Sequence, residues 1–358
     1  MRGKAARQAT MLTAVTPDAL VPRRHPIRRI KPMVDRALSQ LSPTFDRMYA
    51  ANGRASIPPE HLLKACLLMA LFSVRSERQF CERLEYDLLF KWFLDLNIMD
   101  HGFDHSVFAK NKQRLLDADV ARAFLLEIVA QAREQRLLSE EHFSVDGTLL
   151  EAWASVKSFR PRDEDEPPSE GGGRNPEVDF RGERRSNDTH RSTTDPEARL
   201  ARKGKGKEAK LCFGAHVLMD NREGLVVDVR LTPAGGASER DAALEMLEAV
   251  PGAGRITVGA DRGYDTRGFV GGCRKSKVTP HVAQKQRSAI DRRTTRHDGY
   301  RLSQRARKRV EEVFGWVKTV GGGRKLRYCG VERNRFWMEM TTASYNLVRL
   351  SKLTPVSA

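Results

Sequence analysis

The stretch "HFSVDGTLL", from His142 to Leu150, is the first segment of this chain with the composition of a β-strand. Helical patterns precede it. "PPEHLLKACLLMALFSV" opens with prolines and then turns apolar, and "SERQ" at Ser76 has the pattern of a helix capping box. "DADVARAFLLEIVAQAREQRLL" is a further amphipathic segment. The stretch around Asp146 therefore marks the change from an all-α region to a region that contains a sheet.

Strands and helices alternate in the remainder of the chain. "LCFGAHVLMD", "GLVVDVRLTP", "RITVGADRGYD" and "KVTPHVA" have the composition of strands, whereas "SERDAALEMLEAV" and two segments from about 303 to 320 and from 335 to 350 are helical. This order predicts an α/β domain with a mixed sheet. We expect a flexible basic leader over residues 1–25, a helical N-terminal domain over 26–137 and the α/β domain over 138–353.

A polar segment interrupts the α/β domain at about residues 157–210. It is rich in proline, glycine and charges of both signs, so it cannot supply a core, and we expect a long loop or insertion. Its last part, "ARKGKGKEAK" (Ala201 to Lys210), either follows a DNA backbone or is a solvated loop without function.

The charge of the chain points to a polyanionic partner. The 358 residues carry a formal net charge of +17, which favours nucleic acid first and an anionic membrane surface second. The most apolar run, Leu62 to Phe72, contains Lys64 and is too short for a membrane span. The five cysteines include no CxxC pair, which argues against a zinc ribbon and against a disulfide framework. We expect a cytoplasmic protein without a membrane anchor.

Two aspartates stand in or at the end of apolar predicted strands. Asp146 lies inside "FSVDGT", and Asp261 follows the apolar part of "ITVGADRGYD". A carboxylate in a buried strand costs free energy unless it is paired or binds a metal. Active sites of α/β sheets also collect at the ends of strands. For either aspartate alone, a turn or helix cap at a strand end is the favoured role, but two on separate strands favour a shared site.

A third carboxylate lies in "RVEEVFGWVK", Arg309 to Lys318. At about 100° per residue, with Arg307 at zero, Glu311 falls at about 40° and Lys318 at about 20°, which makes one narrow stripe. The neighbouring flank is apolar and should pack on a core; it consists of Val310, Val313, Phe314 and Val317. Glu312 points away as a surface charge. The alternative for Glu311 is a simple ion pair with Arg307.

Carboxylates from two strands and a helix can hold two Mg²⁺ ions, with Mn²⁺ as the expected substitute. A pair of ions about 3.5–4 Å apart would activate the attacking oxygen and stabilise the leaving oxygen of a phosphoryl transfer. Arg307 and Lys318 would hold DNA phosphates beside the metals. The pattern therefore predicts Asp146, Asp261 and Glu311 as catalytic residues and metal ligands.

At these residues the chain resembles the DDE transposases of bacterial insertion sequences, most closely the insertion-sequence five family, a relative of the insertion-sequence four family. The resemblance rests on "VDGT" around Asp146, "ADRGYD" around Asp261 and "SQRARKRVEEVFGWVKTVGGGRK" around Glu311. The helical stretches "GRASIPPEHLLKACLLMALFSVRSERQFCERLEYDLLFKWFLDL" and "FDHSVFAKNKQRL" are also similar to the N-terminal domain of these proteins. The similar region spans about residues 25 to 352.

The family's C-terminal signature is a tyrosine, two residues, arginine, three residues, glutamate, six residues and lysine. Arg307, Glu311 and Lys318 match its last three members. Gln304 stands at the tyrosine position, and Tyr300 lies one turn too early. This departure leaves the role of the tyrosine open in this chain. It does not affect the assignment of the three acidic residues.

The resemblance implies an RNase H-like fold with Asp146 on the first strand, Asp261 on the fourth and Glu311 on a later helix. It implies binding of the element's terminal inverted repeats, Mg²⁺-dependent strand cleavage, and attack of the freed 3′-hydroxyl on target DNA. It further implies at least a homodimer that holds two DNA ends, in the bacterial cytoplasm and associated with the nucleoid.

Further candidate DNA contacts flank the acidic residues. Arg262 and Tyr264 follow Asp261 closely enough to reach a phosphate or a base, although strand-end packing is their alternative role. The basic segment that leads into the Glu311 helix adds Arg305 and Lys308. Two rival functions stay open: a DNA-binding regulator whose α/β part only dimerises, and a stand-alone nuclease of the same fold.

Overall fold

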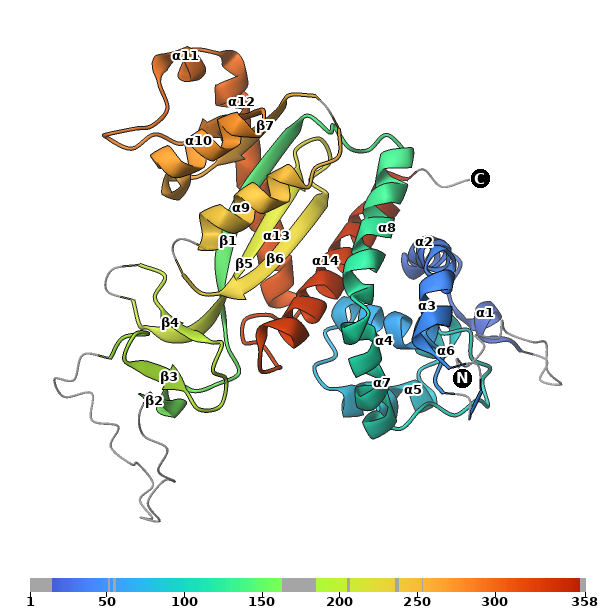
Figure 1. The fold of residues 1–358 in the computed structure, drawn as a ribbon. Coiled ribbons are helices and arrows are strands. Elements are labelled where there is room, and N and C mark those ends of the chain that lie inside the picture. Colours follow the sequence, from blue (N-terminus) through green and yellow to red (C-terminus); the bar gives the residue numbers. More distant parts are fainter. Residues whose placement is uncertain are drawn as a thin grey trace.

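The computed structural model describes residues 15–50, 52–53, 56–162, 185–204, 207–235, 238–252 and 254–354. Figure 1 shows the N-terminal helices on one side, the sheet on the other, and the long helix α14 (Val331–Leu353) between them. Among the described helices, none is both long and apolar enough to cross a membrane.

The N-terminal region is helical, as predicted. Its described helices are α1 (Pro17–Leu20), α2 (Ile27–Gln40), α3 (Ser42–Met48), α4 (Pro59–Leu71), α5 (Glu77–Tyr86), α6 (Leu88–Phe93), α7 (His105–Asp117) and α8 (Val120–Glu134). Proline at the first position of α4 is favourable because that residue needs no hydrogen-bond donor. The Ser76 hydroxyl accepts a hydrogen bond from the Gln79 backbone N–H at 3.0 Å, so the predicted cap of α5 is formed.

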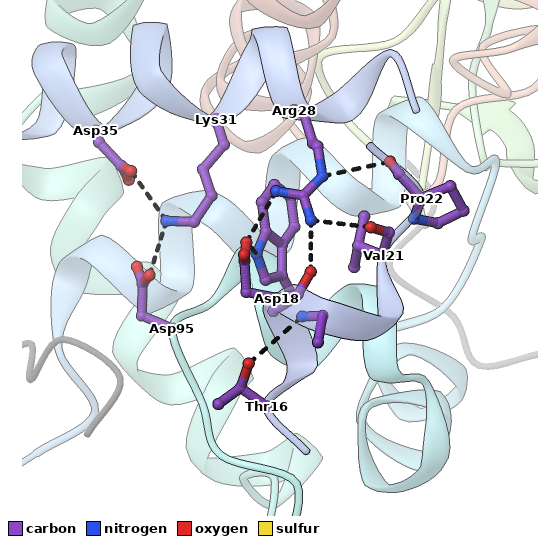
Figure 2. A network of polar contacts seen from close by, with 10 residues as sticks. Thr16, Asp18, Val21, Pro22, Arg28, Lys31, Asp35 and Asp95 are labelled. Carbon is purple, nitrogen blue, oxygen red and sulfur yellow. Dashed lines mark hydrogen bonds and ion pairs between the residues drawn. The ribbon is translucent and has the colours of Figure 1, made fainter. Parts of the chain in front are cut away.

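A polar network fixes α1 to α2 and α6 (Figure 2). The Asp18 carboxylate accepts hydrogen bonds from the Arg28 guanidinium and from the Trp92 indole N–H, both at 2.8 Å. Beside it, Lys31 forms ion pairs with Asp35 at 2.9 Å and Asp95 at 2.7 Å. Helix α1 is therefore docked, although it lies in the segment predicted to be a loose leader; residues 1–14 of that leader lie outside the described residues.

The main sheet is built around β1 (His142–Glu151). β5 (Lys210–Asp220) pairs with it antiparallel on one side, and β7 (Ile256–Ala260) pairs parallel on the other. β6 (Val226–Pro233) extends the sheet antiparallel beyond β5, and β8 (Val278–Val282) extends it parallel beyond β7. The resulting order β6-β5-β1-β7-β8 is that of the RNase H-like fold, which confirms the predicted fold class.

Alternating side chains of β1 face different helices. Phe143 and Val145 pack in a core with α9 (Ser238–Glu248) and α10 (Arg267–Lys275). The other face carries Ser144, Asp146 and Thr148 and meets the C-terminal helical segments. These are α12 (Asp298–Ala306), the 3₁₀ turn η3 (Arg307–Arg309) and α13 (Val310–Thr319), and the short α11 (Arg292–Thr295) precedes them.

Helix α14 connects the two regions through one apolar core. Fifteen of its 23 residues are buried, so it is enclosed on most sides rather than amphipathic. It packs against α8, α4 and β6, and the buried Asn346 amide hydrogen-bonds both the N–H (2.9 Å) and the C=O (2.7 Å) of Val226. The helical region therefore shares one core with the sheet, while α9 and α10 pack on the sheet in a second core.

Of the two alternatives predicted for residues 157–210, a long loop is wrong for the described residues 157–162 and 185–204, which form an inserted lobe. This small lobe contains η1 (Val156–Ser158), β2 (Phe159–Pro161), β3 (His190–Ser192) and β4 (Arg199–Ala201). β2 pairs with β3, and β4 pairs with β5 of the main sheet. The reason is a local apolar anchor, since the buried Phe159 ring stacks on His190 with a centroid distance of 5.5 Å. Residues 163–184 lie outside the described residues.

Candidate active site

Strand register brings the two aspartates to one level. Ser144 of β1 pairs with Gly259 in the parallel ladder between β1 and β7. Two residues further along, the same register sets Asp146 opposite Asp261, at the point where β7 ends. Helix α12 approaches closely here, because a Cβ on Gly259 would lie 3.1 Å from the Ser303 carbonyl oxygen. The candidate site therefore lies where β7 ends beside the middle of β1.

Asp146 is half-buried among charges of its own sign. Burial raises the pKa of its carboxyl to about 6, and the carboxylates of Asp261 and Glu239 add to the rise. The Gly147 backbone N–H, which donates to Asp146 Oδ1 at 2.8 Å, and the Arg307 guanidinium oppose it. An aspartate in this environment holds a proton at weakly acidic pH unless a cation compensates its charge.

Asp261 also caps a turn at the end of its strand, which was the alternative role predicted for it. Its Oδ1 accepts a hydrogen bond from the Gly263 backbone N–H at 2.6 Å, which starts the 3₁₀ turn η2 (Arg262–Tyr264). Arg262 is exposed beside it, where the prediction of a DNA contact stays a prediction. Tyr264, also predicted to contact DNA, is instead completely buried and packs edge-on against Phe269 at 5.0 Å.

The helix predicted to run from residue 303 to 320 is interrupted. The turn η3 separates α12 from α13. A 3₁₀ residue advances by about 120° instead of about 100°, so three of them rotate the downstream helix by about 60° relative to the predicted stripe. Arg307 therefore belongs to a different turn from Glu311. Its Nε donates to Gln304 Oε1 at 3.0 Å, and its guanidinium lowers the pKa of Asp146.

Gln304, at the tyrosine position of the signature, joins three elements. Its amide nitrogen donates to the backbone oxygens of His281, at 2.5 Å in β8, and of Ala260, at 3.3 Å in β7. Its amide oxygen accepts a hydrogen bond from Arg307 Nε. Tyr300, one turn earlier, donates its hydroxyl to the Val282 oxygen at 2.9 Å. Gln304 thus fixes Arg307 to the strand ends that carry the site.

Helix α13 packs as the apolar pattern predicted. The buried residues of this helix are Val310, Val313, Phe314 and Val317. Glu312 is exposed and lies 3.4 Å from Arg349 in an ion pair, in agreement with its assignment as a surface charge. Glu311 is exposed at the start of α13, and within the described part of the chain its carboxylate forms no ion pair with Arg307.

Lys318 extends from α13 and contacts β1. Its ammonium donates to the Thr148 hydroxyl at 2.5 Å, two residues along the strand from Asp146. Burial and the nearby Lys203 lower its pKa. Two predicted cations, Arg307 and Lys318, are therefore both held against the face of β1 that carries Asp146.

A cleft of about 630 Å³ opens beside these strand ends. Its lining combines acidic residues at the sheet with basic residues from the lobe after β4. The lining residues are Gly147, Thr148, Leu149, Asn187, Leu200, Ala201, Arg202, Lys203, Gly214, His216, Ala234, Gly235, Glu239 and Asp261. Such a concave surface, with carboxylates at one wall and cations at the other, suits a phosphate-bearing ligand.

Comparison with protein families agrees with this geometry. Residues 15–114 match the model described as a transposase domain, DUF772, and residues 180–347 match the model described as a transposase DDE domain. The chain carries the two domains of a DDE transposase. Asp261 and Glu311 lie inside the DDE match, whereas Asp146 lies between the two matched ranges and is assigned from its place on β1.

Two further comparisons were made with individual proteins. No curated protein matches the sequence significantly. One solved structure, described as the cryo-EM structure of a piggyBac transposase synaptic complex with hairpin DNA, aligns with 93% of this chain and 77% of its own chain. The sequence identity is 10% and the TM-score is 0.44.

DDE transposase domains generally use divalent metal ions, so the side chains of this site should include atoms that can bind such an ion. Carboxylate oxygens are the hard ligands that such cations prefer, and Asp146, whose pKa is raised mainly by burial, has the carboxylates of Asp261 and Glu239 nearby. Over the residues that the structure describes, no three His, Cys, Asp or Glu side chains converge closely enough to enclose an ion. The donors fit the chemistry of the cation without forming a closed shell.

The sequence did not single out two residues that line the cleft, Glu239 and Thr148. Glu239 looked like an ordinary acidic residue in the first turn of a helix, and Thr148 looked like a strand residue. A signal existed for each. Glu239 follows the strand–helix connection after β6, and Thr148 shares the parity of Asp146 on β1, so both were placed to reach the same edge.

Proposed function

We propose that this DDE transposase cleaves DNA at the terminal inverted repeats of an insertion sequence and joins the 3′ ends to target DNA. The observation that carries the proposal is the level placement of Asp146, in the middle of β1, and Asp261, directly after β7, within a chain that matches a transposase DDE domain. We assign it to the insertion-sequence five family on its "VDGT", "ADRGYD" and Arg307–Glu311–Lys318 motifs.

Asp146, Asp261 and Glu311 are proposed as the catalytic residues and as the ligands of two Mg²⁺ ions, for which Mn²⁺ can substitute. When bound, such ions lower the barrier of an in-line phosphoryl transfer by stabilising charge on the attacking and leaving oxygens. Asp146 must be deprotonated to bind a cation, and the cation supplies the positive charge that its buried environment lacks.

Cations around the acidic edge are proposed to hold the DNA backbone. Arg307 and Lys318 lie against β1, and the exposed Arg262, Arg305 and Lys308 extend the positive surface along η2, α12 and η3. Each phosphate neutralised by such a side chain adds sequence-independent, salt-dependent affinity. The predicted contact of Tyr264 with DNA is not part of this proposal, because its ring is buried.

The helical region, residues 26–137, is proposed to bind the inverted repeats and to contribute to a homodimer that brings two ends together. Its shared core with α14 would transmit the position of the bound end to the sheet. We place the protein in the bacterial cytoplasm, associated with the nucleoid, because its substrate would be chromosomal or plasmid DNA.

A cleavage assay tests the proposal. The substrate is a plasmid that carries the DNA segments flanking this gene, incubated with the full chain and MgCl₂. We expect strand breaks at inverted repeats and, with a second plasmid, joined products. Glu311→Gln should abolish both, whereas Glu312→Gln, its exposed neighbour, should retain them.

Three results would contradict the proposal in different ways. Sequence-specific binding without breaks in any divalent metal would indicate the DNA-binding regulator. Breaks without joined products would indicate the stand-alone nuclease. Loss of cleavage in Glu312→Gln but not in Glu311→Gln would overturn the assignment of the third carboxylate.

A further inference from the structure

Glu239 opens helix α9 and faces the acidic edge of the sheet. An acidic residue in the first turn of a helix ordinarily stabilises the positive end of the helix dipole from solvent. Asp241, in the same turn, fits that role because it is exposed. Glu239 does not, because it is half-buried and lines the cleft together with Asp261 and Gly147.

Because Gly147 has no side chain, the Glu239 carboxylate can lie close to the backbone of β1. A Cβ at position 147 would lie 2.6 Å from Glu239 Oε1, which is closer than real Cβ atoms approach, and 3.1 Å from its Cδ. Gly147 directly follows Asp146, and its backbone N–H donates to that aspartate. The Glu239 carboxylate therefore lies against the backbone of β1, immediately beside Asp146.

The surroundings of Glu239 place negative charge in excess. Burial raises the pKa of its carboxyl, and Asp261 raises it further. The completely buried Tyr264 hydroxyl lies next to the Glu239 carboxylate, yet it forms no hydrogen bond of good geometry with any described residue. A buried hydroxyl and three carboxylates on one edge are polar groups that a further positively charged ligand would satisfy.

We propose that Glu239 is a fourth carboxylate of the catalytic site, which binds a divalent cation together with Asp146 and Asp261. This inference rests on the proposed function for its role in catalysis but not for the binding itself. Glu239 reaches the cation from α9, on the face of the sheet opposite α13. The buried Tyr264 hydroxyl lies next to the Glu239 carboxylate, which gives that ring a role other than contact with DNA.

Cation binding by metal-free full-length protein tests the inference, with MnCl₂ titrated in a calorimeter. We expect Glu239→Gln to raise the dissociation constant for Mn²⁺ at least tenfold. Gly147→Ala should have a similar effect, because its Cβ displaces the Glu239 carboxylate. Asp241→Asn is the matched control, since it removes a charge from the same helical turn, and it should bind Mn²⁺ as wild type does.

Thermal unfolding in EDTA separates lost ligation from misfolding. Glu239→Gln should unfold at the wild-type temperature or above, because it removes charge repulsion. Equal Mn²⁺ affinity of wild type and Glu239→Gln would overturn the inference, even if both cleave DNA and the proposed function stands. Absence of Mn²⁺ binding by wild type would also overturn it. Weakened Mn²⁺ binding in a protein that never cleaves DNA would support the inference and contradict the proposed function.

Discussion

Asp146→Asn should make the metal-free protein more stable at alkaline pH while it destroys activity. The carboxyl has an ordinary pKa of 3.8 in the unfolded chain and about 6 in the folded protein. Because the folded state holds the proton more tightly, Asp146 favours folding below pH 3.8, and this contribution is lost as pH rises through 6. Above that pH, the ionised side chain opposes folding.

The magnitude follows from the two pKa values. A difference of roughly two units corresponds to about 3 kcal/mol, and the partial exposure of Asp146 reduces this to about 1–3 kcal/mol. Asparagine has nearly the same shape and carries no charge. At pH 8 the variant should therefore exceed wild type in unfolding free energy by about 1–3 kcal/mol, and at pH 5 by about half of that.

Urea unfolding in EDTA, followed by circular dichroism at both pH values, measures this difference. Asp241→Asn serves as the control for removing one negative charge from the surface, and its stability should follow wild type at both pH values. Added MgCl₂ should stabilise wild type and leave Asp146→Asn unchanged. A variant that is less stable than wild type at pH 8, or a gain that does not depend on pH, would refute the reasoning.

Three further changes test other parts of the site. Gln304→Ala removes the link between Arg307 and the strand ends; cleavage should fall about tenfold, as expected for a lost positioning contact, with DNA affinity nearly unchanged in a gel-shift assay. An equal loss of affinity would contradict a positioning role. Val313→Ala empties a completely buried position under α13 and should lower the unfolding free energy by about 2 kcal/mol in urea; an unchanged midpoint would show that α13 does not depend on this contact. Arg202→Ala combined with Lys203→Ala should reduce the salt dependence of DNA binding by a slope of about 2, and an unchanged slope would exclude both from phosphate contact.

Local sequence patterns predicted the parts of this fold that depend on local physics. The strand-forming composition of residues 142–150 located β1, and the helical period identified the apolar flank of α13 residue by residue, because both are properties of a single element. The order of strands and helices was sufficient for an α/β domain with a mixed sheet, and the resemblance to DDE transposases supplied the RNase H-like fold. Burial of Asp146 in an apolar strand was equally readable from its neighbours.

Features that depend on long-range pairing were not readable. The level of Asp146 with Asp261 is a property of the parallel register, and the approach of Glu239 requires α9 to cross the edge of β1. The 3₁₀ turn at Arg307 has no distinct composition, so the sequence indicated one regular helix. The turn rotates Glu311 and Lys318 away from the stripe predicted with Arg307. The lobe around Phe159 was missed because one aromatic anchor is a weak signal in a polar segment.

The position of α14 has a consequence for biosynthesis. A ribosome completes α8, α4 and β6 long before it reaches Val331, and those elements have unfilled apolar surfaces until α14 packs among them. The core that the helical region shares with the sheet consequently stays unfinished while most of the chain has already been translated, whereas the core under α9 and α10 needs no residue of α14. The helical region and the sheet face that packs on it should therefore become stable late and together, once α14 has left the exit tunnel.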